Sequence, residues 1–220
     1  MVHADASSFA HGVSKDDAYE QVLLQAEGLF TDQRNWVCND KVGAASNLAN
    51  AASLLWHAYK SMPAPSNAVN WAGKFSFPLP NPRRRDFVVA ESFYVRDPTS
   101  SSPSATATAT ATKPQLILGP FQGKVACQTI RFGRGVCGLA AASRETQLVS
   151  NVDDFPGHIA CDGESKSEVV VPIVAEGPAG TDEVVAIIDI DCAALDGFDD
   201  CDRRNLERLA ELLSRSCDWP

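Results

Sequence analysis

The chain of 220 residues is long enough for one domain with a full hydrophobic core, and its apolar fraction of 45% and charged fraction of 21% are typical of globular proteins. Its net charge of −9 argues against nucleic acid as a partner, and the lack of a long uncharged apolar run argues against a membrane span. The odd count of seven cysteines, and an N-terminus without a basic or apolar segment, lead us to expect a cytoplasmic protein with mostly reduced thiols.

Apolar residues spaced three and four positions apart predict amphipathic helices at 16–30, 42–60 and 200–217, the last with Asp199 or Asp200 as its N-cap. We expect these apolar stripes to face the core. Short β-branched and aromatic segments between the second and third helices predict strands at 87–95, 115–118, 125–130, 147–149, 168–174 and 183–190. Helices that flank a mostly antiparallel sheet define the α+β class.

Two segments interrupt this pattern. Residues 74–86 are rich in Pro and Arg, and residues 97–114 contain a Ser-rich run followed by alternating Ala and Thr. The second segment has no large apolar residue to anchor it in a core. We interpret both as inserted surface loops without a chemical role. The rest of the sequence divides into an N-terminal helical extension, 1–40, and one domain, 41–220.

The last two predicted strands flank a turn-rich stretch and most simply form an antiparallel hairpin. With the turn centred near Pro178–Ala179, Glu168 is expected opposite Asp189, with Asp191 diagonal to it. Asp189 and Asp191 are two residues apart, so both point to one face of the strand, and the isoleucines between them predict a buried opposite face. Three converging carboxylates need a cation, either a metal or an ammonium group, unless they are strand-end acids in water.

Cys127, Cys137 and Cys161 lie within 35 residues, among small, turn-forming or polar neighbours. This context favours reactive thiols, because structural thiols usually lie on apolar faces. Cys161 lies in a loop whose N–H groups can stabilise a thiolate, and the other two cysteines each follow a cationic residue by three positions. One nucleophile with one or two resolving thiols is the arrangement that reversible thiol redox chemistry needs.

Two alternatives stay open for these cysteines. Together with His158 they could bind zinc, although no pair has the short spacing that structural zinc sites favour. They could also be inert core thiols. That description fits the remaining cysteines better, namely Cys38, Cys192, Cys201 and Cys217, of which we place the last two in the C-terminal helix.

At these residues the chain resembles the free methionine-(R)-sulfoxide reductases, a family of GAF-domain proteins. The matching motifs cover about 45–215 without the two insertions. They are Asn70-Trp-Ala-Gly73, Leu118-Gly-Pro-Phe-Gln-Gly-Lys-Val-Ala-Cys127, Gly133-Arg-Gly-Val-Cys-Gly138, Gly157-His-Ile-Ala-Cys-Asp162, Ser167-Glu168 and Ile188-Asp-Ile-Asp191. The resemblance implies that 41–220 is a GAF domain, with a central antiparallel sheet, flanking N- and C-terminal helices and a small-molecule pocket. In the family the motif that corresponds to Asn70-Trp-Ala-Gly73 leads directly into a strand, whereas here the insertion 74–86 intervenes.

The resemblance also implies roles for individual residues. The reacting cysteine corresponds to Cys161 and its disulfide-forming partners to Cys127 and Cys137, with the order of attack between Cys161 and Cys137 left open. The ligands of the substrate's amino group correspond to Glu168, Asp189 and Asp191. The aromatic residue beside the sulfoxide methyl group corresponds to Trp71, with Phe93 or Tyr94 as further pocket aromatics.

The implied reaction reduces free methionine (R)-S-oxide through a sulfenic acid and a disulfide, with a thioredoxin-like dithiol as reductant and no metal or organic cofactor. An ammonium group would supply the cation that the three acids need. Protein-bound methionine lacks that group and would be rejected. The competing interpretations are a non-catalytic GAF module that senses a small molecule and a zinc-stabilised interaction domain. The resemblance also allows a homodimer, because GAF domains commonly pair through flanking helices.

Overall fold

The computed structural model describes residues 13–31, 35–36, 46–73, 94–96, 114–160, 162–176 and 180–219. The helices are α1 (Lys15–Phe30), α2 (Ser46–Ser61), α3 (Gly135–Ser143) and α4 (Asp200–Ser216), with short 3₁₀ turns at Ser66–Ala68 and Val152–Asp154. The strands are β1 (Asn35–Trp36), β2 (Val69–Ala72), β3 (Tyr94–Arg96), β4 (Gln115–Leu118), β5 (Gln122–Gly123), β6 (Thr129–Arg131), β7 (Gln147–Val149), β8 (Ser167–Glu176), β9 (Asp182–Cys192) and β10 (Cys217–Asp218). Every helix in these ranges is too short or too polar to cross a membrane.

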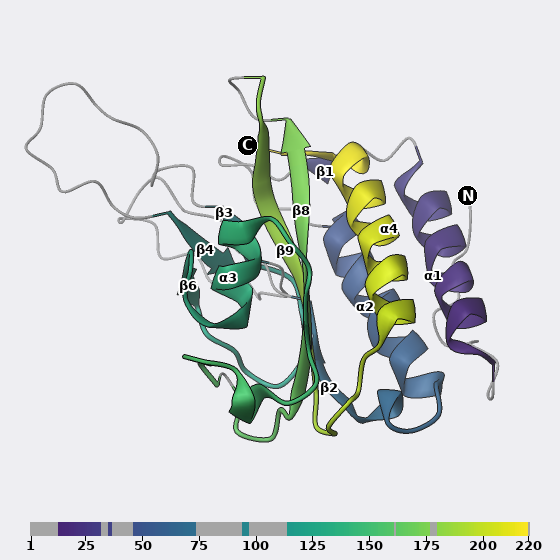
Figure 1. Cartoon of the computed structure of the whole chain (residues 1–220). Coiled ribbons are helices and arrows are strands. Elements are labelled where there is room, and N and C mark those ends of the chain that lie inside the picture. The colour runs from purple at the N-terminus through teal and green to yellow at the C-terminus, as the bar shows by residue number, and fades with distance from the viewer. Residues whose placement is uncertain are drawn as a thin grey trace, which may run out of the picture.

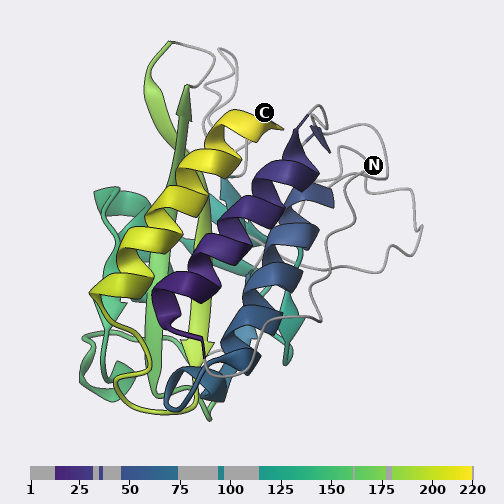
Figure 2. The same ribbon diagram turned by 90° about the vertical axis from the view of Figure 1, so that its right-hand side faces the viewer.

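Three helices cover one face of the sheet (Figures 1 and 2). Helices α2 and α4 pack directly on the strands, and α1 packs on both of them from outside. The predicted stripes of these helices form the main core with alternate residues of β8 and β9, so the helical and α+β predictions are confirmed. Asp199 is the N-cap of α4, as the sequence predicts, and forms a capping box with Asp202.

A buried polar cluster links the three helices. Tyr19 of α1 and Tyr59 of α2 both donate hydrogen bonds to Oδ1 of Asp202, at 2.8 and 3.0 Å, and Asp202 is completely buried. Lys15 Nζ donates to Asp202 Oδ2 and, at 2.9 Å, to Asp199 Oδ2. The cluster therefore fixes the position of α1 on the other two helices, because leaving the Asp202 carboxylate without these donors would be costly.

The long hairpin β8–β9 forms the centre of the sheet. One edge of β9 pairs with β8 along its length, and the other edge pairs with β3 at Ala186–Ile187 and with β2 at Ile190–Cys192. The sheet continues from β3 through β4 to β6, from β2 to β5 and from β8 to β7, with all of these pairs antiparallel. A separate parallel pair joins β1 to β10.

The predicted register of the hairpin is wrong by two residues. Glu168 lies opposite Asp191, and Val170 lies opposite Asp189. The pairing of Glu176 with Asp182 places the centre of the hairpin half a residue beyond the assumed centre at Pro178–Ala179, which shifts each pair by one residue. A bulge after Ile173 adds one residue to β9 and shifts the remaining pairs by one more. Because the total shift is an even number, the three acids still share one face of the sheet, as predicted.

Two other predictions require correction. The segment predicted as a strand at 125–130 is extended only at Thr129–Arg131, and its first residues form no regular element. Cys217 is not in the C-terminal helix, because α4 ends at Ser216 and Cys217 pairs with Asn35 in β10. The predicted strand residues 87–93, both inserted loops apart from Pro114, and Cys38 lie outside the described residues.

The face of the sheet opposite the main core carries α3 (Figure 1). The side chains of the three acids line a cavity beside this helix. Helix α3 packs on β8 and β9 and forms a second, smaller apolar cluster with Leu116, Val170 and Ile187. The isoleucines at 188 and 190 point to the main core, as expected. Side chains of β9 thus alternate between the main core and the side where α3 and the acids lie.

Candidate functional site

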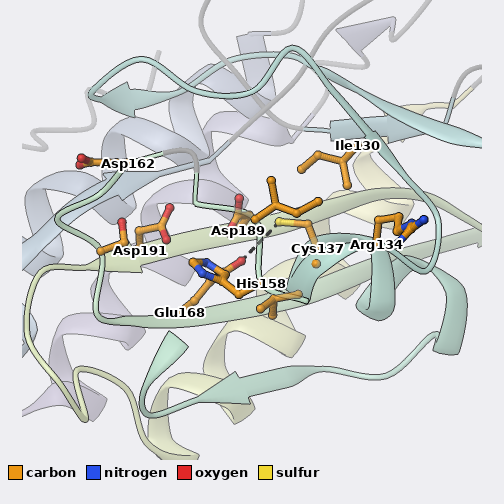
Figure 3. Close-up of a pocket in the computed structure, with 12 residues that line it drawn as sticks. Ile130, Arg134, Cys137, His158, Asp162, Glu168, Asp189 and Asp191 are labelled. Carbon is orange, nitrogen blue, oxygen red and sulfur yellow. Dashed lines mark hydrogen bonds and ion pairs between the residues drawn. The ribbon is translucent and has the colours of Figure 1, made fainter. Parts of the chain in front are cut away.

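A cavity of about 20 Å³ lies between α3, the hairpin and the loop that precedes β8 (Figure 3). A volume of this size holds about one water molecule. Its wall combines the N-terminal turn of α3, the loop and the acid-bearing strands, and the residues are Ile130, Arg134, Gly135, Val136, Cys137, His158, Ile159, Asp162, Ser165, Glu168, Asp189 and Asp191. The three predicted carboxylates and one of the predicted cysteines therefore share one cavity.

The carboxylates in this cavity are almost completely buried. Glu168, Asp189 and Asp191 have exposed fractions of 5%, 1% and 8%. Glu168 and Asp191 are cross-strand neighbours, and Asp189 is two residues from Asp191 on the same face. Buried carboxylates this close repel one another when ionised, so the cavity strongly favours a cationic ligand.

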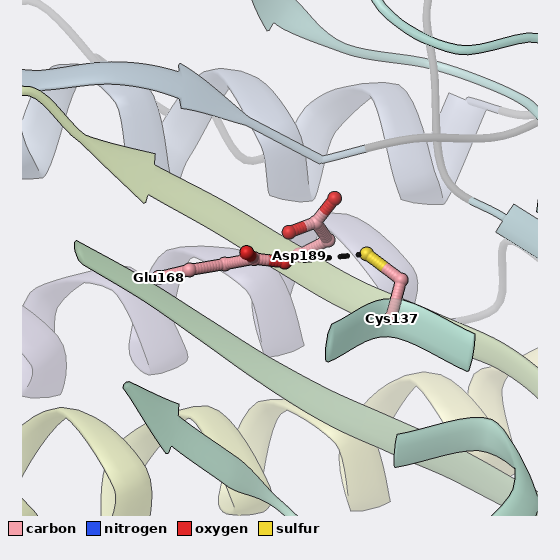
Figure 4. A group of neighbouring side chains, drawn as sticks. All are labelled: Cys137, Glu168 and Asp189. Atoms are coloured by element: carbon pink, nitrogen blue, oxygen red, sulfur yellow. Dashed lines mark hydrogen bonds between the residues drawn. The ribbon is translucent and has the colours of Figure 1, made fainter. Parts of the chain in front are cut away.

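Cys137 lies directly beside two of these acids (Figure 4). Its Sγ donates a hydrogen bond to Oε1 of Glu168 at 3.4 Å. This sulfur and one carboxylate oxygen each of Glu168 and Asp189 all lie within 4.8 Å of one another. The cysteine is 6% exposed and occupies the first turn of α3. The backbone N–H groups at the start of a helix favour a negative charge on a nearby thiol. The neighbouring carboxylates oppose that charge.

His158 extends this cluster on the side of the loop. Its Nε2 is 3.6 Å from Oε2 of Glu168, so Glu168 links the thiol to the imidazole. Burial lowers the pKa of His158, and the attraction of Asp153 and Asp189 for the proton only partly opposes this. The imidazole is therefore neutral near pH 7 and able to accept or donate a hydrogen bond.

Asp162 connects three segments at the edge of the cavity. Its Oδ2 accepts a hydrogen bond from Asn70 Nδ2 at 2.8 Å and lies 3.4 Å from Lys124 Nζ, and its Oδ1 accepts from the backbone N–H of Glu164. Burial alone would raise the pKa of Asp162, but these hydrogen bonds outweigh it and hold the pKa below its usual value. Asp162 thus ties the loop to β2 and to the segment that leads into Cys127.

The described cysteines fall into two groups. Cys127 is half-buried, takes part in a disulfide bond and does not line the cavity. The others are thiols, namely Cys137, Cys192, Cys201 and Cys217. The predicted nucleophile Cys161 lies outside the described residues, although Ile159 and Asp162 on either side of it line the cavity. Of the described members of the zinc set considered from the sequence, Cys137 and His158 line the cavity and Cys127 does not.

Trp71 lies on the acid-bearing face of the sheet but does not line the cavity. It is opposite Asp191 in the β2–β9 pair, is 1% exposed and stacks on Phe121 with ring centroids 5.8 Å apart. Gly123 makes this arrangement possible, because a Cβ there would lie 2.5 Å from the carbonyl oxygen of Asn70. A role for Trp71 beside a sulfoxide methyl group stays a prediction. Phe93, and the side chain of Tyr94, lie outside the described part of the chain.

Sequence reasoning missed α3, and with it the way Cys137 is presented. Gly138 allows the helix to sit against β6, because a Cβ at this position would lie 2.3 Å from the carbonyl oxygen of Arg131. Gly135 and Gly138 on either side of Cys137 resemble a turn, and the helix has only nine residues. The small apolar residues of this segment were the available signal for a buried helix. Val136, Ala140 and Ala141 all belong to the second apolar cluster.

Comparison with known proteins places this chain in a family. The GAF domain profile matches residues 92–216. The free methionine-R-sulfoxide reductase of Saccharomyces cerevisiae is 44% identical over 215 residues, which cover 98% of this chain and 94% of that protein. The chain belongs to the free methionine-R-sulfoxide reductase family of GAF-domain proteins.

Solved structures agree with this placement. A GAF domain structure with 43% sequence identity superposes with a TM-score of 0.73 and covers 100% of this chain and 98% of that chain. The X-ray structure of the free methionine-R-sulfoxide reductase of Neisseria meningitidis in complex with its substrate is 31% identical, with a TM-score of 0.66 and coverage of 96% and 95%. The resemblance found in the sequence and the predicted GAF fold are thus confirmed.

Proposed function

We propose that the protein reduces free L-methionine (R)-S-oxide to L-methionine by thiol chemistry. The observation that carries this proposal is the buried cluster in which a cysteine thiol lies against two carboxylates, in a chain 44% identical to a free methionine-R-sulfoxide reductase. The cluster combines an anionic site for an ammonium group with a sulfur nucleophile. Generic ligand recognition by a GAF module does not need this thiol.

The acids provide selectivity for a free amino acid. The ammonium of methionine sulfoxide would lie among Glu168, Asp189 and Asp191, where it neutralises part of the buried charge. A methionine within a polypeptide has an amide in place of the ammonium and would leave these carboxylates uncompensated. The cavity holds about one water molecule in its present form, so its wall must open further to admit an amino acid.

The chemistry balances as two coupled two-electron steps. A cysteine thiolate attacks the sulfoxide sulfur, the sulfoxide oxygen takes up a proton and passes to the cysteine as a sulfenic acid, and methionine leaves. The sulfoxide sulfur is reduced by two electrons and the cysteine sulfur is oxidised by two. A second thiol then attacks the sulfenic sulfur, which releases water and forms a disulfide. We assign the attack to Cys161, with Cys137 as the alternative that lies in the described cavity.

The disulfide of Cys127 supports a role as a resolving residue. We propose that Cys127 forms the disulfide of the catalytic cycle with Cys161. Lys124 and Asp162 form an ion pair of 3.4 Å, and these residues precede Cys127 by three positions and follow Cys161 by one. That contact holds the two segments side by side. A thioredoxin-like dithiol would reduce the disulfide by thiol exchange and complete the cycle. The cytoplasmic location and the homodimer stay predictions.

The test is turnover by purified protein with dithiothreitol and each epimer of free methionine sulfoxide. We expect methionine to form from the R epimer and not from the S epimer. Cys161→Ser should abolish turnover. Reduced Cys127→Ser, given substrate without dithiothreitol, should form one equivalent of methionine and retain a sulfenic acid, which mass spectrometry of the trapped adduct detects. A protein that binds the sulfoxide without forming methionine would instead be a sensor, and unchanged turnover by Cys161→Ser would refute our choice of nucleophile.

A further inference from the structure

The donor cluster in the cavity is suited to a second kind of cation. One thiol and two carboxyl groups, from α3, β8 and β9, bring a sulfur and two carboxylate oxygens within 4.8 Å of one another. Asp191 lines the same cavity, and the imidazole of His158 lies 3.6 Å from Glu168. We propose that Cys137, Glu168 and Asp189 bind one thiophilic divalent cation, such as Zn²⁺ or Cd²⁺, in the place that the ammonium group of a substrate would take.

The distances fit such an ion with small movements. Zinc binds sulfur at about 2.3 Å and carboxylate oxygen at about 2.0–2.2 Å, so neighbouring ligands in a tetrahedral site lie about 3.3–3.7 Å apart. Sγ of Cys137 and Oε1 of Glu168 are already 3.4 Å apart. Asp189 then has to approach by no more than about 1.5 Å. Binding forms a metal–sulfur bond, and the thiol proton passes to solvent.

The surroundings favour a soft ion over a hard one. The cavity of about 20 Å³ has room for a single ion, and His158 at 3.6 Å from Glu168 can orient that ligand or complete the site. A thiolate ligand selects Zn²⁺ or Cd²⁺, whereas Mg²⁺ prefers oxygen ligands and retains its waters. Cys137 remains a thiol while Cys127 is in its disulfide, so the proposed site is present in this oxidised form too.

The consequence is inhibition by metal. An ion held by these side chains covers the carboxylates and converts the thiol to a bound thiolate. Since the proposed function places the substrate's ammonium on the same carboxylates, metal and substrate would compete. This competition rests on the proposed function, whereas metal binding itself does not.

The experiment is a Cd²⁺ titration of the full chain with its disulfide intact, followed by the ultraviolet band of cadmium–thiolate bonds and by calorimetry. We expect one equivalent to bind the wild-type protein, and we expect Mg²⁺ to give no response. The band should disappear in Cys137→Ser and persist in Cys201→Ser. Cys201 is the matched control, because its Sγ also contacts a carboxylate, Asp16 at 3.1 Å, but belongs to no three-donor group in the described residues.

Two further variants guard against a folding defect in Cys137→Ser. Glu168→Gln and Asp189→Asn keep their shapes and should weaken Cd²⁺ binding about tenfold or more. An absent band in the wild-type protein, or a band that persists in Cys137→Ser, would overturn the metal site even if the protein turns over methionine sulfoxide. L-methionine should displace the metal and N-acetylmethionine should not. Metal binding without such displacement would instead overturn the ammonium site of the proposed function.

Discussion

Replacing Glu168 by Gln should lower activity and raise stability at the same time. The carboxylates of Glu168 and Asp189 approach within 4.8 Å while almost completely buried. At an effective dielectric constant of about 20, two ionised carboxylates at that distance repel one another by about 3 kcal/mol. The amide removes this repulsion in the ligand-free protein and keeps the shape of the side chain, so the free energy of unfolding should rise by up to about 3 kcal/mol.

The same substitution removes one partner of the substrate's ammonium. A hydrogen bond to a charged group contributes about 1.5–3 kcal/mol, which corresponds to a fall in kcat/KM of about tenfold to a hundredfold. The two effects have opposite signs because they share one cause. The negative charge of the carboxylates destabilises the empty site by repulsion and binds the cation by attraction. A merely structural Glu168 would give a loss of stability instead.

The assays are urea denaturation followed by circular dichroism and steady-state reduction of free methionine (R)-S-oxide. Glu211→Gln on α4 is the control, because it makes the same change of charge on an exposed residue outside the cavity and should leave both quantities within about 0.5 kcal/mol of wild type. The reasoning would be refuted if Glu168→Gln were less stable than wild type and retained its kcat/KM.

Three other predictions follow from the structure. Gly138→Ala places a Cβ 2.3 Å from the carbonyl oxygen of Arg131, so α3 must shift with its cysteine; we expect a loss of about 1–3 kcal/mol in thermal denaturation and a reduced kcat/KM. Lys15→Met leaves the carboxylate of Asp202 buried without its cation, which should cost about 3–5 kcal/mol of stability in urea denaturation. Burial and a neighbouring carboxylate raise the pKa of Cys201 to about 11, so mass spectrometry should find this half-exposed thiol unmodified after brief treatment with iodoacetamide at pH 8.

Each of these has a direct control. Gly163→Ala should leave stability unchanged, because its added Cβ has no atom within 4 Å.

For Lys15, burial alone would lower its pKa, but Asp202 and Asp199 raise it above 10.5, so the folded state holds the proton more tightly than the unfolded state. Its contribution to stability is therefore present below pH 10.5 and lost as the pH rises through the folded pKa. Lys15→Met should lack this alkaline loss. Rapid alkylation of Cys201 would contradict the assigned environment.

Much of the fold follows from periodicity in the sequence. The three long helices and the hairpin have apolar residues at the spacing that their packing requires, and Asp199 has the side chain that caps α4. The common face of Asp189 and Asp191 was predictable for the same reason, since the spacing of side chains in a strand does not depend on the register.

Other features depend on contacts that no local pattern records. The bulge after Ile173, which contributes to the shift in register, arises where β9 accommodates an additional residue against β8. Helix α3 is short and contains two glycines, Gly135 with a positive φ and Gly138 at a close contact with β6, so its sequence resembles a turn. The contact of Cys137 with Glu168 could not be predicted without that helix, and neither could the link from Glu168 to His158.

The most direct test of the account compares free methionine (R)-S-oxide with its N-acetyl derivative as substrates of the wild-type protein. The two share the sulfoxide and differ in the ammonium that the buried carboxylates would bind. We expect kcat/KM for the acetylated compound to be lower by at least about a hundredfold, because the acids then bury their charge against a neutral amide. Equal turnover of the two compounds would contradict the claim that Glu168, Asp189 and Asp191 select a free amino acid beside a reactive thiol.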